Sequence, residues 1–287
     1  MATQKITQMT TTQFLSGGEL FETVQNNNTR SVYSSAAKIY YNDPVENLII
    51  NPEFNINQEV ITLGSHSSDV YFRDQWKAGS SGCTASLNNN ELTITAGSII
   101  QPIEDVSIPS GSYYTISWEG TSQVKIDGGS VQDSPYTFNV SSGTHVEVEF
   151  TTGTLKHPVL VKGQLQRRFT RPDFGLELLK CQRYWCKSYN YTVAPGSISF
   201  LGSIIELAVR NYVDTAGTRF PVIMRINPTI IIYSPNSGAV NYVYNGAGDK
   251  VVSNIYYPSE VGIVHIGITS GDVNSNAVWH YTADARI

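Results

Sequence analysis

The chain has 287 residues, of which 40% are hydrophobic and 15% are charged, and its net charge at pH 7 is −5. This length allows two domains, or one domain with extensions, and the hydrophobic content suffices for a packed core. The acidic balance, without an evident basic patch, disfavours a nucleic-acid partner, and the low charged fraction predicts a surface of Ser, Thr, Asn and Gly that suits sugar binding by hydrogen bonds.

Residues 1–45 form a polar N-terminal segment rich in Thr, Gln, Asn and Ser. Short apolar patches at residues 20–25 and 29–33 flank an Asn-rich turn at 26–28, which predicts a small hairpin. The segment is too short and polar to bury a core alone, so we expect it to fold against a partner or within an oligomer. A disordered tail is the alternative.

Residues 46–168 contain short segments in which apolar and polar residues alternate. The alternating segments are 92–95, 114–118, 136–140, 145–150 and 158–162. The turn-forming residues between them are Ser110-Gly111, Asp127-Gly128-Gly129 and Ser141-Ser142-Gly143. Short strands at regular spacing predict an antiparallel sandwich or jelly roll, with Trp76 and Trp118 in its core.

One amphipathic helix is predicted between Phe169 and Trp185. Phe174, Leu178, Cys181 and Trp185 are spaced at i, i+4, i+7 and i+11, which places them on one helical face. A helix between two β-rich blocks is expected to link them and to orient the outer block. The residues that we expect to form a structural junction here are Arg171, Glu177, Cys181, Arg183 and Trp185.

Residues 169–287 are predicted to comprise this linking helix and a C-terminal β domain. The predicted strands are 219–225, 228–234, 261–268 and 278–287, with a hairpin turn at Asn245-Gly246. Trp279 is expected to pack near the last of these strands. The whole chain is therefore predicted to be mainly β.

The three cysteines, Cys83, Cys181 and Cys186, form no even disulfide framework. Cys181 and Cys186 are five apart on the predicted helix and would point about 140° apart, so they would not bridge readily. We interpret all three as free thiols in a chain that folds in a reducing cytoplasm. Residues 1–13 lack the features of a signal peptide, and no apolar run reaches the roughly 20 residues of a membrane span.

No pattern of residues predicts catalysis or a metal site. Glu147 and Glu149 share one strand face, but apolar residues take the other face, which indicates a solvated strand rather than a glycosidase pair. His265 and His280 could meet across adjacent strands, although no Cys or carboxylate spacing accompanies them. We therefore expect no enzymatic activity, no cofactor and no bound metal, and leave open an ion on an oligomer axis.

Aromatic residues offer the clearest candidates for ligand binding. Five tyrosines lie among Asn, Ser and Gly in the C-terminal block: Tyr233, Tyr242, Tyr244, Tyr256 and Tyr257. Tyrosines in polar loops can stack on sugar rings and form hydrogen bonds through their hydroxyls, so we consider these residues candidates for glycan binding. The alternative is that they pack on the sheet surface or between subunits.

Several motifs, in their order along the chain, resemble those of bacteriophage tail-fibre and other virion appendage proteins. They are Gly-x-Glu-Leu-x-x-x-Val-Gln in the N-terminal segment, Asn-Leu-Ile-Ile-Asn-x-x-Phe with Asp74-Gln75-Trp76, Arg-Pro before Cys-Gln-Arg-Tyr, and the ending Trp-x-Tyr-Thr-Ala-Asp-Ala-Arg. This resemblance implies a homotrimer, with a carbohydrate-binding-module-like jelly roll and an N-terminal segment, residues 1–45, that attaches to other virion proteins.

Together these observations favour a virion protein, assembled in the host cytoplasm, that binds a host surface polysaccharide through its outer β domains. A structural adaptor or decoration protein of the virion without receptor binding is the first alternative. A polysaccharide depolymerase is the second, and the lack of a parallel β-helix repeat and of a sharp carboxylate pair counts against it.

Overall fold

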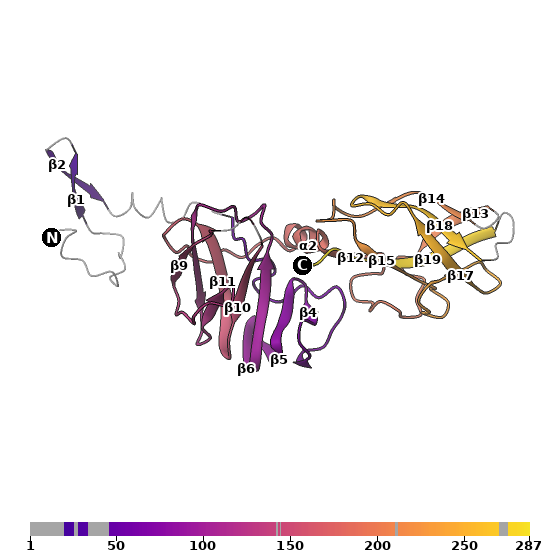
Figure 1. Cartoon of the computed structure of the whole chain (residues 1–287), viewed down its shortest axis with the longest axis horizontal. Coiled ribbons are helices and arrows are strands. Elements are labelled where there is room, and N and C mark those ends of the chain that lie inside the picture. The colour runs from indigo at the N-terminus through magenta and orange to yellow at the C-terminus, as the bar shows by residue number, and fades with distance from the viewer. Residues whose placement is uncertain are drawn as a thin grey trace.

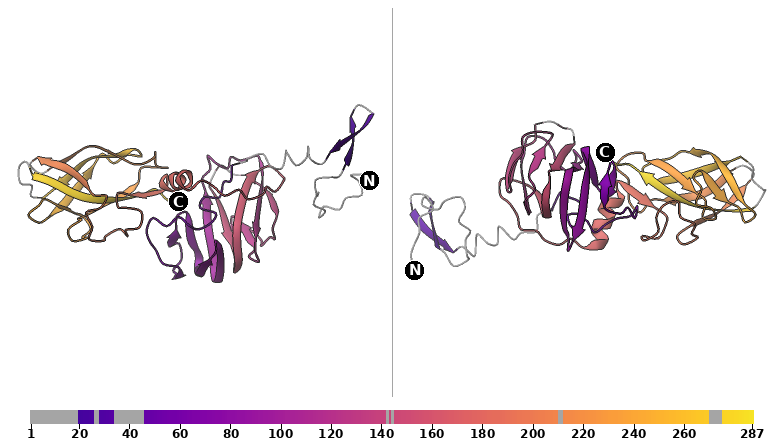
Figure 2. Two further views of the ribbon diagram at one scale, coloured as in Figure 1. Left: turned by 180° about the vertical axis from the view of Figure 1, so that it is seen from behind. Right: turned by 90° about the horizontal axis from the view of Figure 1, so that it is seen from below.

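The computed structural model describes residues 20–25, 28–33, 46–141, 143, 145–209, 212–269 and 275–287. This part of the chain is mainly β, with one α-helix and two large antiparallel sheets, which confirms the predicted fold class. We call residues 46–162 the jelly-roll unit and residues 185–287 the barrel unit. In Figures 1 and 2 the two units lie end to end, with the helix α2 and the C-terminus between them.

The predicted N-terminal hairpin is present. Strand β1 (Leu20–Gln25) pairs antiparallel with β2 (Asn28–Tyr33), and Leu20 lies opposite Tyr33 at the open end. The second strand begins one residue earlier than the alternation of apolar residues predicts. The rest of the expected attachment segment, residues 1–45, lies outside the described residues.

Nine antiparallel strands build the jelly-roll unit. They are β3 (Gly64–His66), β4 (Tyr71–Arg73), β5 (Trp76–Asn88), β6 (Glu91–Ile103), β7 (Tyr113–Glu119), β8 (Val124–Ile126), β9 (Tyr136–Asn139), β10 (Val146–Phe150) and β11 (Gly153–Lys162). The long strand β11 pairs with β6 through its first residues and with β7 through the rest. It therefore passes from one layer to the other, and the strands form a sandwich around a single core.

The core of this unit follows from the alternation in its strands. On β10 every second residue is buried, so Glu147 and Glu149 face outward as predicted while Phe150 faces the core. The rings of Trp76 and Trp118 lie 6.1 and 5.2 Å from the ring of Phe150. Both tryptophans are buried, as expected, and each contributes roughly 1.5–3 kcal/mol by leaving water.

The linking helix is shorter than predicted and buries a different face. Helix α2 spans Phe174–Gln182, with the side chain of Asp173 accepting a hydrogen bond from the backbone N–H of Leu176 at 3.0 Å. Its buried residues are Glu177 and Cys181, whereas Phe174 is exposed. The predicted apolar stripe is therefore wrong at its first member. It is also wrong at its last member, because Trp185 belongs to the following strand.

Eight strands build the barrel unit. They are β12 (Trp185–Lys187), β13 (Ile204–Val209), β14 (Tyr212–Arg219), β15 (Thr229–Tyr233), β16 (Tyr242–Tyr244), β17 (Asp249–Tyr256), β18 (Gly262–Ile268) and β19 (Ser275–Asp284). The first half of β19 pairs with β13 on one side and with β16 on the other, which closes a six-stranded ring. Its second half pairs with β12 and β15. Trp279 is fully buried inside this unit, as expected.

One strand predicted in the barrel unit is absent. Residues 220–225 are irregular, because β14 ends at Arg219 and no ladder continues from it. Phe220 and Met224 are nevertheless buried, and their N–H groups donate to the carbonyls of Val261 and Glu260. The apolar pattern here reflects packing against the core and not a β-strand. The hairpin around Asn245-Gly246, by contrast, is present between β16 and β17.

Candidate functional site

Ion pairs hold the linking region, residues 163–184, against the jelly-roll unit. Arg183, the residue after the helix, donates from Nε to Glu104 Oε2 at 3.1 Å and from Nη2 to Oε1 at 2.8 Å. The hydroxyl of Tyr184 donates to the same carboxylate at 3.0 Å. Arg171, before the helix, donates from Nη2 to the buried Glu53 at 2.8 Å. These charge-assisted bonds tie the helix to the jelly-roll unit from both ends.

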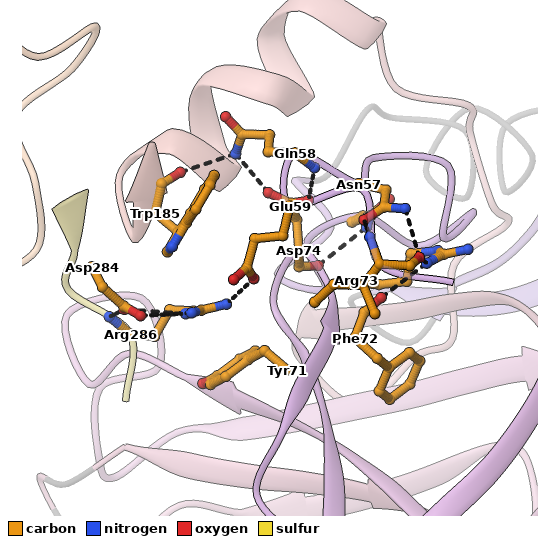
Figure 3. A network of polar contacts seen from close by, with 12 residues as sticks. Asn57, Gln58, Glu59, Tyr71, Phe72, Arg73, Asp74, Trp185, Asp284 and Arg286 are labelled. Atoms are coloured by element: carbon orange, nitrogen blue, oxygen red, sulfur yellow. Dashed lines mark hydrogen bonds and ion pairs between the residues drawn. The ribbon is translucent and has the colours of Figure 1, made fainter. Parts of the chain in front are cut away.

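Arg286, close to the end of the chain, makes a second connection. Its guanidinium lies between the carboxylates of Asp284 and Glu59 and over the ring of Tyr71, 4.4 Å from the ring centre (Figure 3). The Arg286 Nη1 to Glu59 Oε2 distance is 2.5 Å. The hydroxyl of Tyr71 donates to the carbonyl of Ile287 at 2.9 Å. The C-terminal residues of the barrel unit are thus bonded to the jelly-roll unit.

Asp74 and Gln58 complete this connection from the jelly-roll side. Gln58 donates to both carboxylate oxygens of Asp74, at 2.8 and 2.6 Å, and its amide also donates to the carbonyl of Trp185 at 2.9 Å (Figure 3). Burial raises the pKa of Asp74, and burial likewise raises the pKa of Glu59 despite the nearby Arg286. The junction therefore holds two carboxyl groups that protonate more readily than exposed ones.

The buried face of α2 is part of the same junction. The carboxylate of Glu177 accepts a hydrogen bond from the backbone N–H of Asn51 at 2.6 Å, which explains why a charged residue occupies a buried helix position. Cys181 is fully buried, and burial raises the pKa of its thiol, so it is an unreactive packing residue.

All three cysteines are free, as expected, and the structure shows that all three are also buried. Cys186, however, lies on β12 and not on the helix, so the angular separation predicted from a continuous helix is wrong.

The structure brings together the five residues expected at the junction, although Trp185 does so from a strand. Their partners were not identified from the sequence. The direct partners are Asn51, Glu53, Gln58 and Glu104, and the bonds of Gln58 with Asp74 and of Arg286 with Glu59 extend the network. They lie far from the helix in the chain, and no local pattern marks them. The only signal is that Asn51, Asp74 and Arg286 belong to the motifs that carry the resemblance.

A groove opens beside Arg286, on the barrel side of the junction, and we call it the junction groove. Its volume is about 480 Å³, and the residues that line it are Glu59, Trp185, Pro195, Ile226, Asn227, Thr229, Ile231, Tyr233, Thr282, Asp284, Ala285 and Arg286. Thr229, Ile231 and Tyr233 come from one face of β15, because alternate residues of a strand share a face. Thr282 and Asp284 lie opposite Ile231 and Thr229 on β19.

The candidate tyrosines do not form one site. Only Tyr233 lines the junction groove, where its ring lies 6.0 Å from that of Tyr189. Tyr242 and Tyr244 belong to β16, which pairs with the first three residues of β17, whereas Tyr256 is the last residue of β17. Tyr257, which is 73% exposed, contacts the ring of Tyr256.

The residues weighed for catalysis and metal binding take structural roles. Glu147 and Glu149 form ion pairs with Lys77 and Lys125, at 3.6 and 3.3 Å. His280 is held by Ser188 and by the carbonyl of Ser199, both at 2.9 Å.

His265 lies opposite Asp214 and Tyr256 in the sheet, so the suggested pairing of His265 with His280 is not present. No group of three or more metal-binding side chains occurs among the residues that the structure describes. Within the same residues, no helix is both long and apolar enough to cross a membrane.

Comparison with protein-family models and with curated protein sequences finds no match to this chain.

Proposed function

We propose that the protein is a bacteriophage virion appendage, of the tail-fibre or receptor-binding kind, that binds a glycan on the host surface. The ordered series of motifs described above supports this proposal. So do the mainly β architecture and the surface poor in charge. In this proposal the N-terminal segment attaches to other virion proteins and the two β units point outward as a homotrimer.

The observation that carries the proposal is the junction groove. It lies where the barrel unit is fixed to the jelly-roll unit by the ion pair of Arg286 with Glu59, and its lining combines hydroxyl, amide and carboxylate groups with aliphatic side chains. Ligand sites occur preferentially at such interfaces between structural units, and their volumes are typically about 300–1,000 Å³. Three copies in a trimer would strengthen weak single sites through multivalency.

Adsorption of the purified chain to bacterial cells and to their isolated surface polysaccharides tests this function. Binding to at least one host polysaccharide is the expected result. Cells and polysaccharides that all fail to bind would overturn the proposal. A chain that lacks residues 1–45 provides the matched test of attachment, because it should still bind polysaccharide while no longer joining the virus particle.

A structural adaptor is a second candidate, and one observation favours it. Strand β13 exposes Ile205 and Leu207 on its outer face, and aliphatic side chains in this position suit a protein partner better than a sugar. In that case the unmodified chain would bind other virion proteins and no host polysaccharide. The adsorption experiment therefore separates the two candidates.

A further inference from the structure

We propose that the junction groove binds an uncharged or amino-bearing sugar residue and discriminates against acidic sugars such as uronic and sialic acids. The biological use of this site rests on the proposed function, whereas the chemistry of the groove can be tested without it. Three properties carry the inference: the groups that line the groove, the charges at its wall, and the way its lining is held in place.

The lining matches the chemistry of a sugar. Thr229 offers a hydroxyl and Asn227 offers an amide, and both residues are exposed. On the same face of β15, Ile231 lies between Thr229 and Tyr233. Among the described residues, none forms a hydrogen bond with the hydroxyl of Tyr233. A sugar ring presents hydroxyl groups at its edge and C–H groups on its faces, so it can satisfy polar and aliphatic groups that lie side by side.

The charges at the wall select against an acidic ligand. The charged residues in the lining are Glu59, Asp284 and Arg286, so the carboxylates outnumber the cation by one. All three nitrogens of the Arg286 guanidinium already donate, Nε and Nη2 to Asp284 and Nη1 to Glu59. The positive charge of Arg286 is thus already shared by two carboxylates, so a carboxylate of a ligand would meet two like charges in addition to the cation.

The same wall can accept a donor. Glu59 uses its Oε2 atom for Arg286, and no described residue donates to its Oε1 atom. The side chain of Glu59 retains 26% of its exposure. A sugar hydroxyl can therefore donate to this oxygen, and the ammonium of an amino sugar can do so with opposite charge.

The lining is held in place without a ligand. The floor consists of β15 and β19, which pair from Thr229–Asp284 to Tyr233–His280. The wall is fixed by Arg286, whose side chain is mostly buried between Tyr71 and Asp284. Binding would thus require little ordering of side chains, so a small ligand can bind despite making few contacts.

Chemical-shift titration of the isotope-labelled full chain tests the inference. The probes are the methyl glycosides of glucose, galactose, mannose and N-acetylglucosamine, then glucosamine and galactosamine, and finally the methyl glycosides of glucuronic and galacturonic acid. At least one neutral or amino sugar should shift the resonances of Thr229 and Tyr233. The acidic counterpart with the same ring stereochemistry should bind at least about tenfold more weakly.

Conservative variants distinguish sugar binding in the junction groove from sugar binding elsewhere on the barrel unit. Tyr233→Phe and Thr229→Val each remove one hydroxyl. Each variant should lower the affinity for the sugar about fivefold, which is the effect of one neutral hydrogen bond. Tyr257→Phe removes a hydroxyl elsewhere on the same unit and should leave the affinity unchanged.

Three results would overturn the inference: no shift with any probe, equal or tighter binding of the acidic sugars, or equal affinities in Tyr233→Phe and Tyr257→Phe. Adsorption to host polysaccharide by a chain that shows one of these results would leave the proposed function standing and refute only the groove. Sugar binding in the groove without any adsorption to hosts would refute the proposed function and leave the inference about the groove standing.

Discussion

The jelly-roll unit and the barrel unit differ in where their large apolar side chains lie. In the jelly-roll unit the aromatic residues fill the core, among them Phe54, Phe72, Trp76 and Phe150. Most of its exposed apolar side chains are valines, namely Val60, Val70, Val106 and Val131. The barrel unit exposes larger groups, which include Ile198, Phe200, Leu201, Ile205, Leu207 and Tyr212.

Strand β13 shows what this difference means. Ala208 is buried on its inner face, while Ile205 and Leu207 are 62% and 49% exposed on its outer face. A strand with apolar residues on both faces is typical of a sheet that is covered on both sides. The jelly-roll unit therefore completes its own core, whereas the barrel unit keeps an apolar outer surface, and this is why we propose that intermolecular contacts form on the barrel.

The largest expected effects come from the central tryptophan of each unit. Trp76→Ala and Trp279→Ala should each lower the free energy of unfolding by about 3–5 kcal/mol. The corresponding Phe variants sharpen the comparison. Trp76 Nε1 donates to the carbonyl of Asn51 at 3.0 Å, whereas Trp279 Nε1 is buried without a partner among the described residues.

Trp76→Phe should therefore be more destabilising than Trp279→Phe by about 1 kcal/mol, the value of one hydrogen bond. Urea unfolding of the four variants gives these differences. Equal losses in the two Phe variants would show that the hydrogen bond of Trp76 does not distinguish the two cores.

The next largest effect concerns the connection between the units. Arg286→Ala leaves Glu59 and Asp284 without their cation, and breaking a buried pair in this way costs about 3 kcal/mol. Calorimetry should then show the two units unfolding at separate temperatures. Lys125→Ala is the control, because its pair with Glu149 lies within the jelly-roll unit and contributes at most about 1 kcal/mol. A single unchanged transition in Arg286→Ala would contradict the role of this residue.

Buried histidines and buried carboxyl groups should respond to acid in opposite senses. Burial lowers the pKa of His280 in the barrel unit below 6.5, so the unfolded chain gains a proton first. Its contribution to stability is therefore lost as the pH falls below 6.5. Burial raises the pKa of Glu59 and Asp74 above their usual values of 4.5 and 3.8, so these groups stabilise the folded state as the pH falls towards those values.

Thermal unfolding between pH 7 and pH 4 measures both trends. His280→Gln should reduce the loss of stability below pH 6.5, to which His66 also contributes because burial lowers its pKa, and Asp74→Asn should reduce the gain at lower pH. An unaltered profile in either variant would show that its residue does not set the pH dependence.

The smallest expected effect on folding comes from the outer face of β13. Ile205→Ser with Leu207→Ser should change the stability of an isolated chain by no more than about 0.5 kcal/mol, as for other exposed positions. In the proposed homotrimer the same change should lower the oligomer mass measured by light scattering. Val131→Ser on the jelly-roll unit is the matched control and should leave the mass unchanged. An unaltered mass in the double variant would exclude this face from the interface.

The sequence predicted strands such as β10, β11, β18 and β19 because alternation with period two is a local property of a half-buried strand, but it predicted neither β5 nor β13. The segment 145–150 and the hairpin at residues 20–33 illustrate this, since their apolar and turn residues suffice to place them. The strand predicted at residues 219–225 is absent, because buried and exposed residues can also alternate in an irregular segment that packs on a core. The helix was extended too far because Trp185 continues the helical spacing while its backbone already pairs with β19.

The junction groove could not be predicted in the same way. Glu59 and Arg286 lie 227 positions apart in the sequence, and only the folded chain brings them together. The sequence identified Tyr233 by its residue type and surroundings, yet it grouped this residue with four tyrosines that lie elsewhere. Residue type alone indicates the kind of contact a side chain can make, whereas the site depends on which strand edges meet.

Binding of the purified full chain to an array of immobilised bacterial surface polysaccharides tests the central claim most directly. We predict that at least one polysaccharide retains the chain, and that a neutral or amino sugar component of that polysaccharide competes for binding. A chain that is folded and oligomeric but is retained by none of the polysaccharides, and by no host cell, would contradict the account.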